Sequence, residues 1–415
     1  MKNSRQRSLY SLIDILFVSL FAAAVLAVGI CIYALPRQGF SEQENRSLAD
    51  LPSLSASSLG DGSFFTSLSD FYADNIPLRQ YLIRGKALCE LALGRQQNNG
   101  VIFTGDGRQT DTCRYQSTKL LEENLDAICR FSSSQPLDSL CVFVPRSIDL
   151  LSEGSEGSEG SEESRRILRI VADSGAGDTD LTQNLTIDDY YTTDHHLTAL
   201  GAYKVYRVIA ESLGVQPYAV TDFDMELASD SFLGSTYSRS GLLATSYDSV
   251  YLPRYAGDTD LTVACCDTGC ALNSLYERVR LDTKDKYSVF LGGNHGMLTV
   301  TDEGADKPRL LLIKDSFANA VIPFLARHFD LTVIDPRYSN APLDGLVSSR
   351  IYDKTVILCG IDTLATNGAF KRLFVSFITG DIVHSVGYLK SFSLLSSTER
   401  YSLASLFAAS RLSSR

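Results

Sequence analysis

The stretch "RLLLIKDSFANAVIPFLARHFDLTVID", residues 309–335, predicts the fold class. Its two ends, "RLLLI" (309–313) and "LTVID" (331–335), are short apolar runs with the length and composition of buried strands. Between them, "SFANAVIPFLARHF" (316–329) predicts a helix, and "TVILC" (355–359) predicts a further strand. Repeated strand–helix–strand units favour a parallel sheet covered by helices, which is an α/β fold.

The same alternation begins earlier in the chain. The amphipathic segment 117–134 predicts a helix, and the apolar run "LCVFVP" (140–145) predicts a buried strand. A second helix is expected at 198–214, ending near a glycine, and residues 220–300 look β-rich and irregular. The acidic repeat "SEGSEGSEGSEES" (152–164) cannot bury apolar area, so it predicts a solvated loop or a disordered insert.

The N-terminal residues predict a membrane anchor. The run "ILFVSLFAAAVLAVGICIYAL" (15–35) has no charged residue and, as a helix, matches a hydrocarbon core of about 30 Å. Lys2, Arg5 and Arg7 precede it, so the positive-inside bias places residues 1–11 in the cytoplasm and the remainder outside. A cleaved signal peptide is the alternative, but the run is long for one and lacks a clean small-x-small site. We therefore expect an uncleaved transmembrane anchor at residues 12–35.

The rest of the chain divides into a juxtamembrane part, a main domain and a tail. Residues 36–97 form the juxtamembrane part, in which apolar residues recur at helical spacing and Pro77 should separate two helices. The α/β pattern occupies residues 98–380, and the serine-rich residues 381–415 form a poorly defined tail. The formal charge of −11 argues against a nucleic-acid-binding protein, which would show basic clusters.

Ser316 is the first candidate for chemistry. It lies just past an apolar strand and just before a predicted helix, and ligands of open α/β sheets bind outside the carboxyl ends of strands. Free backbone N–H groups at the helix start favour the negative charge that develops when a serine attacks a carbonyl. The alternative is structural, because serine is also a preferred N-cap.

Asp194 and His196, in "TTDHHLTALGAY" (192–203), form a second candidate. Residues two apart in an extended segment share a face, so the carboxylate can bond one ring nitrogen and leave the other for a serine hydroxyl. His195 between them should point the other way. A metal site is less favoured because no third ligand follows at a typical spacing, and a polar turn before a helix is the structural alternative.

"VFLGGNHG" (289–296) is the third candidate. The side-chain amide of Asn294 can donate a hydrogen bond to an oxyanion, and the glycines allow close approach of a ligand. His295 can contact a substrate. The alternative is an ordinary β-turn, since Gly-Gly-Asn is common turn chemistry.

Several of these segments together resemble a known family. "TTDHHLTALGAY" resembles the signature of the DHHW protein family, in which Trp usually stands where this chain has Leu197. Other matching pieces occur in the same order, over roughly residues 40–360: "SEQENRSLADLP", "FYADNIPLRQ", "NNGVIFTGDG", "FLGSTYSRSG", "KDKYSVFLGGNHG" and "LLLIKDSFANAVIPFLARHFD". This family is similar to the SGNH-hydrolase-like domains of the alginate O-acetylation proteins.

The resemblance implies a flavodoxin-like, three-layer α/β sandwich with a parallel sheet and a Ser-His-Asp triad. Ser316 would be the nucleophile, His196 the general base and Asp194 the carboxylate that orients it, while Asn294 and His295 would contact the oxyanion or substrate. It implies neither a metal nor a cofactor. Replacement of the aromatic residue by Leu197 is expected to change substrate stacking or local packing.

The implied activity is that of a membrane-anchored, extracytoplasmic O-acetyltransferase or acetylesterase that acts on a cell-envelope polysaccharide. Transfer requires an acetyl donor outside the cell, and the resemblance suggests a membrane-bound O-acyltransferase as the partner that supplies it. A different class of function also fits the sequence: a non-catalytic envelope protein that binds glycan or scaffolds an export complex.

Overall fold

The computed structural model divides into two compact units, Met1–Arg95 and Gln96–Arg415. It describes residues 2–41, 46–112, 117–134, 139–151, 161–242, 246–255, 261–266, 269–272, 274–302, 304–339, 343 and 352–379.

The first unit begins with a long helix, α1 (Lys2–Ala34). Its segment Ile13–Ala34 has 22 residues with a mean hydropathy of 2.9. A helix of this length rises roughly 33 Å, which is enough to cross a hydrocarbon core. The predicted apolar segment is thus a candidate span by length and composition.

The remainder of the first unit is a hairpin and three helices. Strand β1 (Phe40–Ser41) pairs antiparallel with β2 (Arg46–Ser47). The helices are α2 (Ala56–Gly60), α3 (Ser63–Asn75) and α4 (Arg79–Ala92). The predicted break at Pro77 is confirmed, because Ile76 is extended and Leu78 has a φ of 60° between α3 and α4.

A seven-stranded mixed sheet organises the second unit. Its strands are, in spatial order, β10 (Cys270–Leu272), β9 (Leu261–Cys265), β11 (Met297–Asp302), β13 (Asp330–Ile334), β12 (Arg309–Lys314), β14 (Lys354–Gly360) and β6 (Ser139–Val144). The predicted strands at 140–145, 309–313, 331–335 and 355–359 all form.

The predicted parallel sheet is confirmed for one half of a mixed sheet. The strands from β13 to β6 are parallel, whereas β11 pairs antiparallel with both β13 and β9, and β10 pairs antiparallel with β9. For β9 and β10 the physical reason lies in their connection. A parallel pair needs a crossover of a dozen or more residues, and only four residues separate these two strands.

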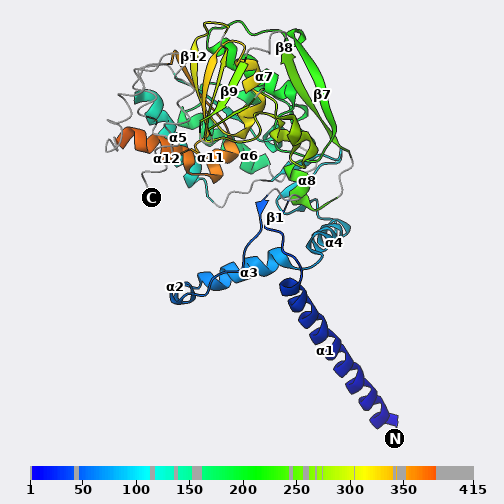
Figure 1. The fold of residues 1–415 in the computed structure, drawn as a ribbon. Helices are drawn as coiled ribbons and strands as arrows, with labels where there is room; N and C mark the ends of the chain where they lie inside the picture. Colours follow the sequence, from blue (N-terminus) through cyan, green and yellow to red (C-terminus); the bar gives the residue numbers. More distant parts are fainter. Residues whose placement is uncertain are drawn as a thin grey trace. The chain divides into compact units, whose positions relative to one another are not determined.

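Both faces of the sheet are buried. Along β12, Leu310 and Leu312 belong to one hydrophobic cluster, and Leu311 and Ile313 belong to another on the opposite face. The first cluster includes α7 (Ala199–Ser212) and the antiparallel pair β7 (Phe223–Phe232) and β8 (Asp248–Tyr255). The second includes α5 (Lys119–Ser134), α11 (Ile361–Thr366) and α12 (Ala369–Thr379), on the other side of the sheet (Figure 1). Burial on both faces explains why these strands read as continuous apolar runs.

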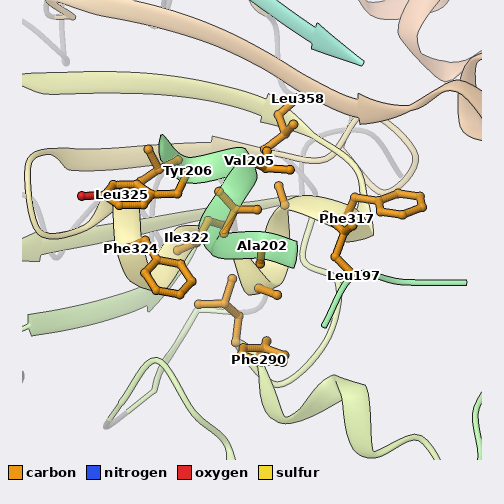
Figure 2. Packing of buried hydrophobic residues seen from close by; sticks show 14 of the residues in the cluster. Leu197, Ala202, Val205, Tyr206, Phe290, Phe317, Ile322, Phe324, Leu325 and Leu358 are labelled. Carbon is orange, nitrogen blue, oxygen red and sulfur yellow. The ribbon is translucent and has the colours of Figure 1, made fainter. Parts of the chain in front are cut away.

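The first cluster also contains the residues that follow the strands. Figure 2 shows Ala202 and Val205 of α7 packed with Phe317 and Leu358 near the ends of β12 and β14. Phe290, before β11, belongs to the same cluster. The core therefore fixes the segments that carry the candidate residues. A three-stranded sheet, β3 (Gln97–Asn98), β4 (Val101–Phe103) and β5 (Gln109–Asp111), completes the unit's strands within the described residues.

Residues 316–329 do not form the single helix that was predicted. The structure has a 3-10 helix η9 (Ser316–Ala320), a short helix α9 (Ile322–Leu325) and turns before β13. Pro323 lies in the first turn of α9, where its missing N–H leaves no hydrogen bond unmade, so it starts a new helix rather than continuing η9.

The predicted loop at 152–164 needs a partial correction. Helix α6 (Ser161–Ser174) begins inside that range, with Glu162 and Glu163 in its first turn, where the helix dipole favours acidic residues. Ser164 is buried beside Arg146, 3.3 Å from its guanidinium, which ties the start of α6 to the unit. Residues 152–160 and the predicted tail at 381–415 lie outside the described residues.

We predict that Asn124→Leu destabilises the second unit by about 2–5 kcal/mol. Asn124 is buried, donates to the carbonyls of Leu364 and Asn367 at 2.7 and 3.0 Å, and accepts from the N–H of Lys371 at 2.6 Å. Leucine would leave those three backbone groups without this partner. Urea unfolding measures the loss of stability, and Asp126→Ala, at an exposed position of the same helix, is the control. If both variants have the same free energy of unfolding, Asn124 does not stabilise the unit in this way.

Candidate active site

A buried carboxylate fixes the turn that follows β12. Asp315 accepts hydrogen bonds from the N–H groups of Phe317 and Gly360, at 3.0 and 2.8 Å, and thereby ties the end of β12 to the end of β14. A Cβ at position 360 would lie 2.5 Å from the Phe317 ring, so the close approach requires glycine. Ser316, at the first position of η9, lies in the chain between Asp315 and Phe317. It is therefore held at the carboxyl edge of the parallel strands.

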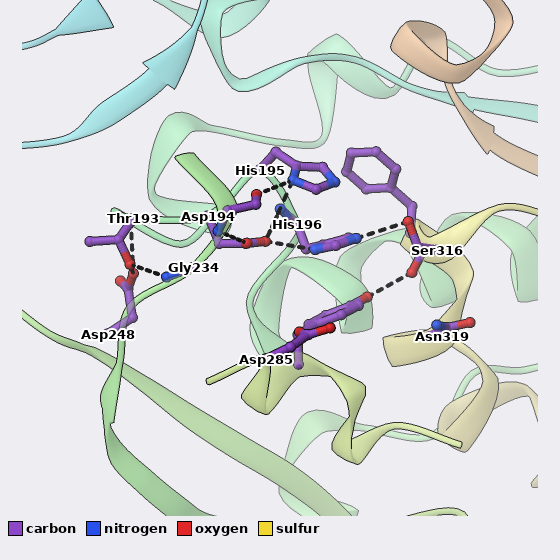
Figure 3. Close-up of polar contacts among 12 residues, drawn as sticks. Thr193, Asp194, His195, His196, Gly234, Asp248, Asp285, Ser316 and Asn319 are labelled. Atoms are coloured by element: carbon purple, nitrogen blue, oxygen red, sulfur yellow. Dashed lines mark hydrogen bonds and ion pairs between the residues drawn. The ribbon is translucent and has the colours of Figure 1, made fainter. Parts of the chain in front are cut away.

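Three of the predicted residues meet at this edge. The Nε2 of His196 lies 2.9 Å from Ser316 Oγ, and its Nδ1 lies 2.6 Å from Asp194 Oδ1 (Figure 3). Because an ionised carboxylate only accepts, the proton on the imidazole belongs on Nδ1, and Nε2 is free to accept from the serine hydroxyl. All three side chains are buried.

The chain around α8 (Ser235–Ser240) holds Asp194 in place. Its Oδ1 also accepts from the backbone N–H of His196 at 2.9 Å, and its Oδ2 accepts from the N–H of Ser235 at 2.7 Å. A Cβ at Gly234 would lie 2.2 Å from the Cβ of Asp194, so only glycine permits this contact. Burial raises the pKa of Asp194, but the adjacent His196 and His195 and these hydrogen bonds outweigh it and hold the pKa well below the usual range.

The imidazole of His196 is packed between two other rings. The Tyr287 ring stacks on it with centroids 3.8 Å apart and planes 7° from parallel, and the His195 ring lies 3.9 Å away on a tilted plane. The hydroxyl of Tyr287 donates to the backbone carbonyl of Ser316 at 2.9 Å. Tyr287 thus touches both the histidine and the serine, which restricts rotation of the imidazole.

The prediction that His195 points away from His196 is wrong. The segment bends, because Asp248 accepts hydrogen bonds from the N–H groups of Thr192 and Thr193 at 2.8 and 2.7 Å. The His195 ring consequently lies on the same side as His196, with its Nδ1 2.7 Å from Ser235 Oγ and its side chain 35% exposed. Burial and the neighbouring imidazole lower the pKa of His195.

Asn294 joins a buried polar cluster around Lys314, which precedes Ser316 by two residues. The ammonium of Lys314, which is fully buried, lies 2.8 Å from Asn319 Oδ1, 3.3 Å from Asp335 Oδ2 and 3.4 Å from Asn294 Oδ1. Asn319 Nδ2 also donates to Asn294 Oδ1 at 3.1 Å. Because an ammonium only donates, the oxygen of the Asn294 amide must face this cluster, and its Nδ2 points away from it. Asn294 is itself exposed, so that amide can meet a ligand.

His295, the other predicted contact residue, has a place in its own loop. Its Nε2 donates to the carbonyl of Leu291 at 2.9 Å, and the ring is half-buried. Its role toward a substrate stays a prediction.

Leu197 is a core residue. Its side chain is fully buried in the same hydrophobic cluster as Phe290 and Phe317 (Figure 2). The replacement of the aromatic residue is predicted to change either substrate stacking or local packing. Because Leu197 lies in the core, it is local packing that the replacement affects.

Asp194, His195 and His196 also form a group that could hold a metal ion, with ligand atoms within 4.8 Å of one another. The group contains the three adjacent residues that the metal alternative would use. However, His196 Nδ1 and Asp194 Oδ1 are only 2.6 Å apart, a hydrogen-bond distance. A zinc ion bound tetrahedrally to both atoms at about 2.0–2.2 Å would spread them to roughly 3.4 Å. The contacts therefore fit a hydrogen-bonded relay better than a metal centre.

Sequence reasoning missed Tyr287, Asp315, Gly234 and the Lys314 cluster. Asp315 could have been found, because an aspartate directly before a helix start is a preferred cap. Nothing in the local sequence around Tyr287 indicates that its ring lies on His196, which is far away in the chain.

Comparison with known proteins agrees with the predicted resemblance. A model of the DHHW protein family matches residues 182–334, a range that includes Asp194, His196 and Ser316. No curated protein matches the chain. The resemblance to the DHHW family is confirmed.

Solved structures show the fold of the second unit. A DHHW family protein from Eubacterium siraeum DSM 15702 matches with 20% identity and a TM-score of 0.55, over 66% of this chain and 95% of that chain. Bacillus cereus PatB1, in a structure with a sulfonyl adduct, matches with 19% identity and a TM-score of 0.51, over 66% and 99% of the two chains. The O-acetyltransferase domain of Pseudomonas putida AlgJ matches with 13% identity and a TM-score of 0.40, over 67% and 99%.

We predict that Asp194→Asn flattens the dependence of stability on pH. The folded chain holds the pKa of Asp194 below its unfolded value of about 3.9, so the unfolded state binds the proton first as the pH falls. The wild-type free energy of unfolding should therefore drop below about pH 5, and this contribution should be missing from the variant.

Urea unfolding at neutral and mildly acidic pH measures the difference. Asp230→Asn, at an exposed position of β7, is the matched control. An Asp194→Asn variant with the full wild-type pH dependence would show that Asp194 is not an ionised, paired carboxylate.

Proposed function

We propose that this chain is a membrane-anchored, extracytoplasmic O-acetyltransferase or acetylesterase that acts on a cell-envelope polysaccharide. One observation carries the proposal: His196 lies within hydrogen-bond distance of both Ser316 Oγ, at 2.9 Å, and Asp194 Oδ1, at 2.6 Å. Acyl transfer through a covalent serine intermediate requires a serine, an imidazole and a buried carboxylate in this order.

In this proposal each of the three residues has its own step. His196 Nε2 takes the proton from Ser316 as Oγ attacks the acetyl carbonyl, and it then gives that proton to the departing alcohol. The acetyl group is left as an ester on Ser316. A sugar hydroxyl, or water, then attacks this ester while His196 accepts its proton, and Ser316 is regenerated. Asp194 stabilises the imidazolium and stays ionised, because its surroundings hold its pKa low.

The packing around His196 supports this reaction. Stacking by Tyr287 keeps the imidazole plane aimed at Ser316, and the Tyr287 hydroxyl fixes the Ser316 carbonyl. Because the reacting groups are already in position, little reorganisation of the site is needed during the reaction, and the activation barrier is lower. We propose that the Asn294 amide donates to the oxyanion, since its oxygen is committed to Lys314 and Asn319.

Similarity to known folds supports the general class. PatB1, which has the same fold, was determined with a sulfonyl adduct, and sulfonyl reagents react with activated nucleophiles. With helices or strands on both faces of its sheet, the second unit fits the SGNH-hydrolase-like three-layer sandwich that the resemblance implies.

In this proposal, residues 1–11 are cytoplasmic, 12–35 span the membrane, 36–97 are juxtamembrane and 98–380 form the catalytic domain. The support for anchoring is the length and apolarity of Ile13–Ala34. Acetyl transfer outside the cell needs a donor, so we propose a membrane-bound O-acyltransferase as the supplying partner. Leucine in place of the aromatic residue at position 197 does not favour the non-catalytic alternative, because Leu197 is a buried core residue.

Ser316→Ala should reduce turnover of an acetyl ester by the full-length protein by about 10³-fold or more, because it removes the nucleophile. In the same samples, a sulfonyl fluoride should modify the Ser316 peptide of the wild type only, as detected by mass spectrometry.

Ser231→Ala, at an exposed position of β7, is the matched control and should behave as wild type. Equal turnover in wild type and Ser316→Ala would refute the assignment. A metal chelator should leave turnover unchanged; loss of activity on chelation would instead favour a metal held by Asp194, His195 and His196.

Asn294→Ala should lower kcat by about 10²–10³-fold with little change in KM, because an oxyanion donor acts mainly in the transition state. Steady-state kinetics on the acetyl ester measure both constants. Asn184→Ala, at an exposed position in the same unit, is the control. A rise in KM at unchanged kcat would mean that Asn294 binds substrate without stabilising the oxyanion.

A further inference from the structure

Helix α4 of the first unit has an exposed apolar face. Three of its large apolar or aromatic side chains are exposed: Tyr81 is 70% exposed, Leu82 55% and Leu88 54%. The flanking residues Leu78 and Leu93 are 71% and 80% exposed. Exposure of so many large apolar groups along one short helix is unusual for a surface that faces only water.

These residues lie on a single stripe. At 100° per residue, positions 81, 82, 85, 88, 89 and 92 of α4 fall within an arc of about 120°. The residues are Tyr, Leu, Gly, Leu, Cys and Ala, and none carries a charge. Arg84 and Lys86 fall on the two borders of the arc. The face is therefore an apolar stripe with a basic residue on either side.

The dimensions fit a helix that lies on a membrane. With 14 residues, α4 is about 21 Å long, too short to cross a hydrocarbon core of about 30 Å. An apolar stripe bordered by Arg and Lys, with a tyrosine near one end, is the pattern of helices that rest at the boundary between lipid headgroups and acyl chains.

Contacts within the first unit keep α4 near the candidate span. The hydroxyl of Tyr33, in the last turn of α1, lies 2.8 Å from that of Tyr72 on α3, and Arg37 lies 5.2 Å from the centre of the Phe71 ring. These contacts hold α3 against the end of α1.

A second set of contacts fastens α4 to α3. Arg79 Nε, at the start of α4, donates to the carbonyl of Ala73 at 2.9 Å, and the guanidinium lies 3.5 Å from Asp74. Leu78 follows Tyr72 by six positions, so α4 begins no more than about 20 Å from Tyr72, the residue that contacts the last turn of α1.

We infer that α4 lies on the lipid bilayer, with its apolar stripe in the headgroup–acyl boundary and with Arg84 and Lys86 against anionic headgroups. This inference rests on the proposed membrane anchoring through α1. Lipid is the occupant that the tether to α1 and the basic borders favour, because anionic headgroups attract Arg and Lys near the surface.

The experiment uses the absence of tryptophan from the sequence, because any introduced Trp is then the only one. The full-length protein is placed in nanodiscs of mixed neutral and anionic lipid, with or without bromine on the acyl chains, and Trp emission is recorded. Leu82→Trp tests α4. Leu227→Trp on β7 is the matched control, since Leu227 is 52% exposed and lies in the second unit. Val25→Trp, within Ile13–Ala34, reports on the anchor.

We expect the Leu82→Trp emission to be blue-shifted and to be quenched by brominated lipid. The quenching should be weaker in discs that contain only neutral lipid. The Leu227→Trp emission should not be quenched. Quenching of Val25→Trp without quenching of Leu82→Trp would overturn the inference and leave the anchor intact. A Leu82→Trp emission that is blue-shifted but not quenched would also overturn it, because protein would then cover the stripe. If Val25→Trp is not quenched, the anchoring fails and this inference fails with it.

Discussion

The ionised, buried carboxylate of Asp194 is the constraint on which the site depends. A buried charge is costly unless it is paired and hydrogen-bonded, so the chain must bring donors to both of its oxygens. The N–H of Ser235 and the ring of His196 meet that need, and Gly234 makes the approach possible. With its Nδ1 committed to Asp194, the imidazole can present only Nε2 to Ser316. The orientation of the relay thus follows from satisfying one charge.

A second buried ionic group contains Lys314, two residues before Ser316 in the chain. Lys314 and Asp335 are both fully buried, and Arg337 completes the pairing by donating to Asp335 at 2.7 Å. Burial lowers the pKa of Lys314, while Asp335 acts in the opposite direction. This cluster orients two side-chain amides because an ammonium can face only their oxygens. Asp194 and the Lys314 cluster are therefore both fixed by buried charges that must be paired.

The sheet explains why these groups meet. In the parallel half, β12 and β14 end at the same edge, and Asp315 joins them just where Ser316 begins. Helix α7, which follows Thr198, buries its apolar face on the sheet and brings the Asp194–His196 segment to that edge. The antiparallel half contributes the loop before β11, with Tyr287 and Asn294. The groups of the candidate site thus come from three parts of the chain, each held by the same core.

The sequence by itself determined the buried strands, α7, the apolar length of α1, the break at Pro77 and the pairing of Asp194 with His196. Each of these depends on residues close together in the chain, where periodicity and turn chemistry act directly. Only the tertiary structure decided the antiparallel half of the sheet, the position of His195 beside His196, the contact with Tyr287 and the burial of Leu197. Those features depend on which backbone and side-chain groups, far apart in the chain, pair in space. The spacing of residues within a short segment does not indicate that pairing.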